Sequence, residues 1–162
     1  MAENPAEITA SDRKENNIMY LEDIQISSQK TVENIVIDKD EMLDFAKKYN
    51  PVKIHTDVEY AKKTRFGDVI AAGMMSFLSV WSHYVQVDFA GDDLVAGKST
   101  SVEWSKPVFA GDVLRGVATV TGLSFRNEHN GLLTVSIDVF NQNDEKVLTS
   151  VVESIVKRRP KE

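Results

Sequence analysis

The chain has 162 residues, of which 42% are hydrophobic and 27% are charged, and this length and composition suit one globular domain and exclude global disorder. The 25 Asp and Glu outnumber the 19 Lys and Arg, giving a net charge of -6, so we expect no nucleic-acid partner. Cysteine is absent from the sequence, which excludes disulfides, thiolate metal ligands and thiol nucleophiles. The three histidines, His55, His83 and His129, form no paired-histidine motif, and we expect no metal.

Residues 1–17 are polar and have no basic start followed by an apolar core, so they do not resemble a secretory signal. We expect a flexible tail there, one domain over residues 18–162, and a cytoplasmic location. Residues 69–87 carry no formal charge and approach membrane-spanning length. Their polar side chains favour a buried central helix instead, and we expect no membrane partner.

The first predicted elements are a strand over residues 31–37 and a helix that begins after Asp38. Asp38 with Glu41 three residues later has the form of a capping box. Apolar residues then recur at helical spacing over residues 42–49, and Pro51 disfavours the helical conformation for the residue before it. The helix is therefore predicted to end at Asn50.

Downstream of that helix, Thr56 and Glu59 repeat the capping-box pattern and predict a short helix to about residue 63. The segment 72–85 has bulky apolar residues on nearly every side, so we expect other structure to wrap around it. Between residues 94 and 157 the hydrophobic period changes to two, which indicates strands.

Two turns divide this region of strands: a hairpin turn at Asn130-Gly131 and a second turn over residues 141–145. The last strand, 147–157, is apolar on both faces in its middle, as expected for a strand that is covered twice or lies at a subunit interface. The element order predicts an α+β fold in which an antiparallel sheet packs on one buried helix.

One segment combines features that suggest a site. It contains Asn50-Pro51, then His55, and it is followed by Gly73 at the start of the apolar helix. A lone histidine in a loop is by itself more often structural, so the surrounding motif decides how His55 is interpreted.

That motif resembles the MaoC-like acyl-CoA dehydratases, which include enoyl-CoA hydratases that produce (R)-3-hydroxyacyl-CoA. The resemblance spans residues 20–157 and rests on several pieces in the family's order: Tyr20-Leu21-Glu22-Asp23-Ile24, Phe45-Ala46, the segment 50–57, Phe66-Gly67, Ile70-Ala71-Ala72-Gly73-Met74, and the segment 104–114. It implies a single hot-dog domain, a sheet wrapped around a central helix.

The resemblance also implies roles for particular residues. His55 corresponds to the family's catalytic histidine, and Gly73 to the glycine whose backbone N–H stabilises the enolate oxygen. The alternative for Gly73 is that it only permits close packing. The neighbouring residues Ile70, Ala71, Ala72 and Met74 would contact substrate.

Asn50 departs from the family, which has an aspartate five residues before the histidine. An amide can orient a water molecule or the histidine, but it cannot accept a proton as a carboxylate does. Three hypotheses stay open: a weakened hydratase, an altered reaction, or a protein that binds acyl-CoA without turnover. A two-residue shift of the alignment would place Lys48 at the aspartate position, so the carboxylate is missing in both alignments.

Several other residues are weaker candidates. Asp57 is expected to stabilise the short helix rather than to replace the missing aspartate. His83 is expected in the core or at an interface, and His129 at a turn. The central-helix residues Met74, Met75, Phe77 and Trp81 are expected to pack in the core rather than to line an acyl tunnel.

The function that the resemblance implies is reversible hydration of an enoyl-CoA to the (R)-3-hydroxyacyl-CoA in a homodimer, without a cofactor. His55 would act as acid and base, and Asn50 would position water. A non-catalytic acyl-CoA-binding protein is the second hypothesis, and an acyl-CoA thioesterase is the third.

Overall fold

The computed structural model describes residues 19–161. The tail predicted over residues 1–17 lies outside this range, as do residues 18 and 162. The domain boundary at residue 18 therefore stays a prediction.

Five antiparallel strands form one sheet in the order β1-β3-β4-β5-β2. Residues that alternate inward on the interior strands β3 and β4, among them Leu114, Val120 and Ile137, are buried in a single core, as period-two patterning predicts. β2 forms one edge of the sheet and is exposed along nearly its whole length. The strand bounds are Gln29–Val36 for β1, Leu94–Trp104 for β2, Val113–Phe125 for β3, Asn130–Phe140 for β4 and Lys146–Lys157 for β5.

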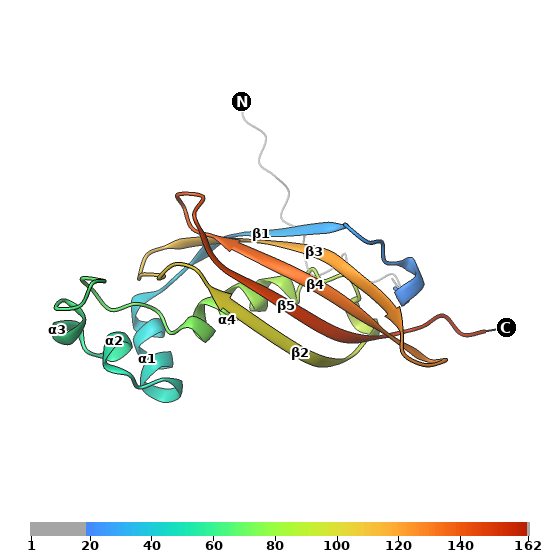
Figure 1. Cartoon of the computed structure of the whole chain (residues 1–162), viewed down its shortest axis with the longest axis horizontal. Coiled ribbons are helices and arrows are strands. Elements are labelled where there is room, and N and C mark those ends of the chain that lie inside the picture. Colours follow the sequence, from blue (N-terminus) through green and yellow to red (C-terminus); the bar gives the residue numbers. More distant parts are fainter. Residues whose placement is uncertain (1–18, 162) are drawn as a thin grey trace, which may run out of the picture.

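The central helix α4 (Gly73–Tyr84) runs across one face of the sheet (Figure 1), which is the hot-dog arrangement expected from the sequence. Its sheet-facing side is buried, but Met74 and Leu78 are 44% and 40% exposed. The expectation that other structure wraps the whole helix is therefore wrong for a single chain, because on this side only the end of helix Lys39–Tyr49 lies beside Met74 and Leu78 and both stay partly exposed. None of the helices within residues 19–161 is long and apolar enough to cross a membrane.

Helices α1 (Lys39–Tyr49), α2 (Lys53–Thr56) and α3 (Val58–Ala61) lie together beyond the N-terminal end of α4 (Figure 1). The predicted cap of α1 is confirmed, since the Asp38 carboxylate accepts a hydrogen bond from the Glu41 backbone N–H at 2.9 Å. Two short 3-10 helices, η2 (Leu21–Asp23) and η3 (Gly91–Asp93), precede β1 and β2.

The cap predicted at Thr56 is wrong by one residue. Asp57 caps α3, and its carboxylate accepts from the Tyr60 N–H at 3.0 Å. Thr56 instead ends α2, where its hydroxyl donates to the Val52 carbonyl at 3.2 Å. The reason is the additional helical turn α2, which was not predicted and which uses Thr56 as its last residue. The short helix also ends at Ala61, before the expected residue 63.

The hairpin turn predicted at Asn130-Gly131 is also displaced. Both residues belong to β4, and the chain turns over residues 126–129, where the Asn127 side chain accepts from the N–H groups of His129 and Asn130. Gly131 is needed for a close approach, because a Cβ atom there would lie 2.2 Å from Leu21 and 2.8 Å from the Ser124 carbonyl oxygen. The second predicted turn, between β4 and β5, is confirmed.

The last strand, β5, is covered on one face only. Val152 and Val156 are buried against the core, whereas Val151 is 39% exposed on the other face. The double cover expected from its two apolar faces is not provided by the described part of the chain.

Candidate active site

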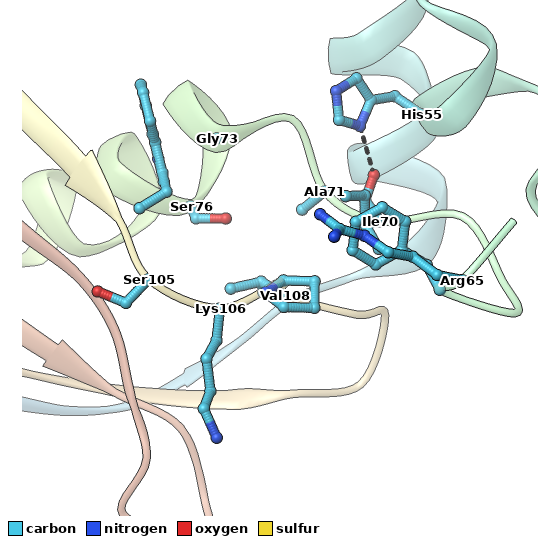
Figure 2. Close-up of a pocket in the computed structure, with 12 residues that line it drawn as sticks. His55, Arg65, Ile70, Ala71, Gly73, Ser76, Ser105, Lys106 and Val108 are labelled. Atoms are coloured by element: carbon cyan, nitrogen blue, oxygen red, sulfur yellow. Dashed lines mark hydrogen bonds between the residues drawn. The ribbon is translucent and has the colours of Figure 1, made fainter.

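His55 lies on the short helix α2 and is half-buried. Its Nδ1 atom lies 2.8 Å from the carbonyl oxygen of Ile70 (Figure 2). A carbonyl oxygen only accepts, so in the neutral ring Nδ1 carries the proton and Nε2 keeps its lone pair. The contact therefore fixes both the orientation of the ring and the tautomer that a general base needs.

The segment that holds His55 is itself anchored at several points. The Ile70 N–H donates to the Ile54 carbonyl at 3.3 Å, and Ile70 forms an isolated antiparallel bridge with Phe109. The next residue, Ala71, donates its N–H to the Val108 carbonyl at 2.8 Å. These bonds tie α2 to the entrance of α4 and to the loop after β2.

Gly73 is the first residue of α4, and the preceding residue, Ala72, provides no side-chain cap. Among the described residues, the backbone N–H groups of Gly73 and Met74 have no hydrogen-bond acceptor. Free N–H groups and the positive end of the helix dipole favour a developing negative charge. The packing alternative for Gly73 also holds, because a Cβ atom there would lie 2.5 Å from the Trp104 indole.

His55 and Gly73 line one pocket of about 270 Å³, together with Ile70, Ala71 and Ser76. Ser76 is 1% exposed, and among the described residues its hydroxyl has no hydrogen-bond partner. Figure 2 shows this hydroxyl pointing into the space between α4 and the segment of Ile70 and Ala71. The pocket thus combines a base, free N–H groups and a buried hydroxyl.

Asn50 lies in a second pocket, of about 420 Å³, with Ala72, Met74 and Leu78. This pocket is largely apolar and shares no lining residue with the pocket of His55. The two residues are still linked through the backbone, since the Val52 N–H donates to the Asn50 carbonyl and the His55 N–H donates to the Val52 carbonyl. The helix end predicted at Asn50 is confirmed.

Two cationic side chains, Arg65 and Lys106, also line the pocket of His55. Lys106 forms an ion pair with Glu145, and Figure 2 shows its amine directed away from His55. Hydrogen bonds from Asn141 and from Lys106 hold the pKa of Glu145 below its usual value. The Arg65 guanidinium lies over the Phe66 ring, 4.8 Å from its centroid.

The remaining candidates lie away from this pocket. Asp57 stabilises the short helix, as expected, and does so as the cap of α3 in place of Thr56. His83 is exposed and its Nδ1 lies 3.0 Å from the Ser79 carbonyl, so it does not lie in the core. The alternative, a position at a subunit interface, stays a prediction. His129 lies in the turn between β3 and β4, as expected. Within residues 19–161 no group of three His, Cys, Asp or Glu comes together as a metal site.

The apolar residues of α4 divide between core and pocket. Met75 and Phe77 are buried in the core, and Trp81 packs against it with its ring 5.8 Å from that of Phe77. Core packing is therefore confirmed for these three, whereas Met74 is exposed on the wall of the second pocket.

Sequence reasoning missed Ser76, Trp104 and Arg65 as pocket residues. The spacing of three residues between Gly73 and Ser76 could have placed both in the first turn of the helix. No local pattern connects Trp104 or Arg65 with His55, because the three meet only through the packing of β2 and the loops against α4.

Comparison with known proteins shows the family and the fold of the chain. A sequence profile of the family described as "MaoC like domain" matches residues 23–141. The uncharacterized protein YdeM from Bacillus subtilis is 28% identical over 86% of this chain and 100% of its own length.

Two solved structures share the fold over nearly their whole length. A monoamine oxidase regulatory protein from Archaeoglobus is 30% identical, with a TM-score of 0.81 over 87% of this chain and 95% of its own. A MaoC-like dehydratase from Rhodospirillum rubrum is 25% identical, with a TM-score of 0.76 over 88% of this chain and 99% of its own.

The sheet, the central helix and these matches define a hot-dog protein with a histidine beside the start of its central helix. The chain belongs to the MaoC-like domain family. This membership, with the dehydratase among its solved relatives, supports hydratase or dehydratase chemistry in general.

Proposed function

We propose that the protein catalyses the reversible hydration of a trans-2-enoyl-CoA to the (R)-3-hydroxyacyl-CoA. The observation that carries the proposal is the contact between His55 Nδ1 and the Ile70 carbonyl, which leaves Nε2 as a base in a pocket that also holds the start of α4. An acid-base group and a donor for the enolate oxygen are the two elements that this reaction needs.

In the hydration direction, Nε2 of His55 accepts a proton from water while the water oxygen bonds to C3 of the enoyl group. The electron pair of the double bond moves toward the thioester oxygen, where the free N–H of Gly73 stabilises the developing charge. The proton on Nε2 then passes to C2, and the reverse sequence dehydrates the product. Water is the only co-reactant, so the proposed reaction uses no cofactor.

Two further residues support the substrate in this proposal. In this proposal Asn50 acts from the second pocket and holds or orients the water, since its amide can both donate and accept hydrogen bonds. The Ser76 hydroxyl, buried in the first turn of α4, donates a second hydrogen bond to the thioester oxygen. Ile70 and Ala71 contact the thioester in the pocket of His55, whereas Ala72 and Met74 face the acyl chain in the second pocket.

The proposal includes a homodimer. The exposed apolar side of α4 at Met74 and Leu78, and the exposed edge strand β2, are surfaces that a second copy would cover. An apolar surface of this kind costs solvation free energy while it stays in water.

A protein that binds acyl-CoA without turning it over is the second candidate, favoured by one observation. Asn50 cannot accept a proton, and it lines a different pocket from His55. A thioesterase is the third candidate, and it would release free CoA.

The test compares wild type, His55→Ala and Asn50→Asp on crotonyl-CoA, following loss of the enoyl absorbance and release of free CoA in the same samples. We expect hydration by wild type and a loss of at least about a hundredfold in kcat for His55→Ala, the usual contribution of a general base. A gain in Asn50→Asp would show that the amide limits the rate. CoA release without hydration would establish the thioesterase, and binding without either reaction would establish the binding protein.

A further inference from the structure

We propose that the pocket of His55 has a second activity, the isomerisation of a 3-enoyl thioester to the conjugated 2-enoyl thioester. The reaction moves one proton from C2 to C4 and shifts the double bond from C3=C4 to C2=C3. It consumes no water, so it belongs to a different reaction class from hydration. The inference rests on the proposed function for the roles of His55 and Gly73, because both reactions form an enolate of the same thioester.

The pocket offers one base for proton transfer. His55 lines it, and none of the described residues in its lining is an aspartate or a glutamate. The charged side chains of the lining, Arg65 and Lys106, are cations and do not accept protons. A proton that His55 removes from the substrate therefore stays on His55 until it is returned. One base that gives back the proton it has taken is what an allylic shift requires.

The contact with Ile70 keeps the His55 ring in one orientation through such a cycle. Nδ1 lies 2.8 Å from the Ile70 carbonyl oxygen and donates its proton to it. When Nε2 takes up a second proton, Nδ1 still carries its own, so this hydrogen bond persists in the cationic ring. Nε2 can thus serve C2 and C4 in turn, because only one carbon separates them and both lie on the same face of the planar enolate.

The proposed donors at the start of α4 act on the thioester oxygen and not on water. Within residues 19–161 the N–H groups of Gly73 and Met74 have no acceptor. The Ser76 hydroxyl is buried in the same turn, and Figure 2 shows it pointing into the pocket. These donors stabilise negative charge on the oxygen in any reaction that passes through the enolate.

The residue proposed to hold water is the one that lies apart. Asn50 lines the second pocket, which shares no lining residue with the pocket of His55. Around His55 the lining includes the apolar side chains of Phe66, Ile70 and Val108. Isomerisation needs no ordered water, so the pocket of His55 contains by itself the groups that this reaction uses. Hydration also needs the water that Asn50 holds from the second pocket.

The isomerisation balances without a further reactant. Nε2 of His55 accepts the proton from C2, and the electron pair of the broken C2–H bond forms the enolate, whose oxygen is bonded by the N–H of Gly73. The pair then returns to form C2=C3, and the pair of C3=C4 takes the proton from Nε2 at C4. No electrons are gained or lost. Conjugation with the thioester carbonyl stabilises the product and sets the direction.

The experiment supplies 3-butenoyl-CoA, with hydration of crotonyl-CoA measured in parallel on the same proteins. Chromatography with mass detection counts crotonyl-CoA together with the 3-hydroxybutyryl-CoA that forms from it. We expect wild type to isomerise the substrate and His55→Ala to lose at least about a hundredfold in rate. His55→Asn keeps a donor for the Ile70 carbonyl and should be equally inactive, which separates loss of the base from loss of the fold. His129→Ala removes a histidine outside the pocket and should match wild type.

Two further variants separate the steps of the two reactions. Ser76→Ala should slow hydration and isomerisation by the same factor, because the enolate is common to both. Asn50→Ala keeps the backbone hydrogen bonds of this residue, and it should slow hydration about tenfold more than isomerisation, the effect of one lost hydrogen bond to water. An equal loss of both reactions in Asn50→Ala would overturn the inference, because isomerisation would then depend on the second pocket.

The two activities can fail separately. Hydration of crotonyl-CoA by a wild type that leaves 3-butenoyl-CoA unchanged would reject the isomerase and keep the hydratase. Isomerisation without hydration would reject the hydratase and keep the isomerase. Isomerisation that persists in both His55 variants would also overturn the inference, because another group would then be the base.

Discussion

At the scale of single residues, the candidate site depends on backbone groups as much as on side chains. His55 is oriented by the Ile70 carbonyl, and the first donor that we propose for the enolate oxygen is the backbone N–H of Gly73. Such groups are fixed by the fold before substrate arrives, so little reorganisation is needed as charge develops. Substitutions of single residues should therefore change kcat by displacing these backbone groups slightly.

Gly73→Ala should lower both stability and kcat. The new Cβ would lie 2.5 Å from the Trp104 indole, so the indole or the first turn of α4 must move. Because Trp104 is 49% exposed, the indole can swing outward, and we expect a loss of about 1–2 kcal/mol in the free energy of unfolding. Thermal denaturation and steady-state hydration measure the two effects.

The double variant Gly73→Ala with Trp104→Ala is the control, since it removes the clash. Gly73→Ala should lower the melting temperature less in the Trp104→Ala background than in wild type. This difference is a favourable coupling between the two sites. Strict additivity of the two substitutions would contradict the contact.

Ser76→Ala should reduce kcat/KM about tenfold while leaving the melting temperature close to that of wild type. The hydroxyl has no partner among the described residues, so its removal breaks no hydrogen bond within the fold. Ser79→Ala on the same helix is the matched control, because that hydroxyl donates to the Met75 carbonyl at 2.9 Å and is not part of the pocket. Wild-type activity in Ser76→Ala would remove Ser76 from the mechanism.

At the scale of elements, the site lies where three short helices meet the start of α4. The cap at Asp38 determines where α1 begins, and Pro51 makes it end at Tyr49. The turn of α2 then carries His55 back toward Ile70. A substitution that destabilises α1 should therefore also displace His55, because Asn50 connects the end of α1 with this turn.

Asp38→Ala should lower the free energy of unfolding by about 1 kcal/mol, because the Glu41 N–H loses its acceptor. Chemical denaturation followed by circular dichroism measures this loss. Asp40→Ala removes a charge from the same first turn but no cap contact, so it should cost less. Equal losses in the two variants would show that charge near the helix end, rather than the cap, is responsible.

At the scale of the whole molecule, the two ends of the described chain are joined by charged groups. The Glu22 carboxylate accepts from the Arg158 Nε at 3.0 Å and from the Arg159 backbone N–H at 3.0 Å. Burial on its own would raise the pKa of Glu22, but the hydrogen bonds from Arg159 and Arg158 outweigh it and hold the pKa below the usual 4.5. This contact connects η2 with the chain just beyond β5.

The contribution of Glu22 to stability should depend on pH in one direction. Because its pKa is lowered by folding, the contribution is fully present above about pH 4.5 and is lost as pH falls through the folded pKa. Glu22→Gln should thus cost about 0.5–1 kcal/mol at pH 7 and progressively less in acid. Denaturant unfolding at several pH values tests this, with the exposed Glu33→Gln as control; a cost that stays constant with pH would contradict the ion pair.

The exposed apolar side of α4 predicts self-association. Leu78→Glu places a charge on that side, and we expect it to shift a dimer toward monomer in sedimentation and scattering measurements. Ile26→Glu is the control, since Ile26 is 53% exposed but lies outside α4. A wild type that is monomeric at all concentrations would reject the homodimer.

The sequence by itself determined the kinds and order of most elements. The α1 cap, the helix end at Asn50, the apolar helix and the strands after residue 94 all follow from local patterns that act within a few residues. The family motif also brought out His55 and Gly73 without any coordinates. The errors fell at the α3 cap and the Asn130-Gly131 turn, where neighbouring residues compete for the same local role.

Only the tertiary structure decided which residues share a pocket and which surfaces stay uncovered. It placed Asn50 apart from His55, brought Ser76, Arg65 and Trp104 to the site, and left one side of α4 exposed. It also explained Gly131 through Leu21, which is far away in the sequence but lies where a Cβ atom at Gly131 would be. Such contacts depend on how the sheet packs against α4, and side-chain packing between distant segments leaves no periodic signal in the sequence.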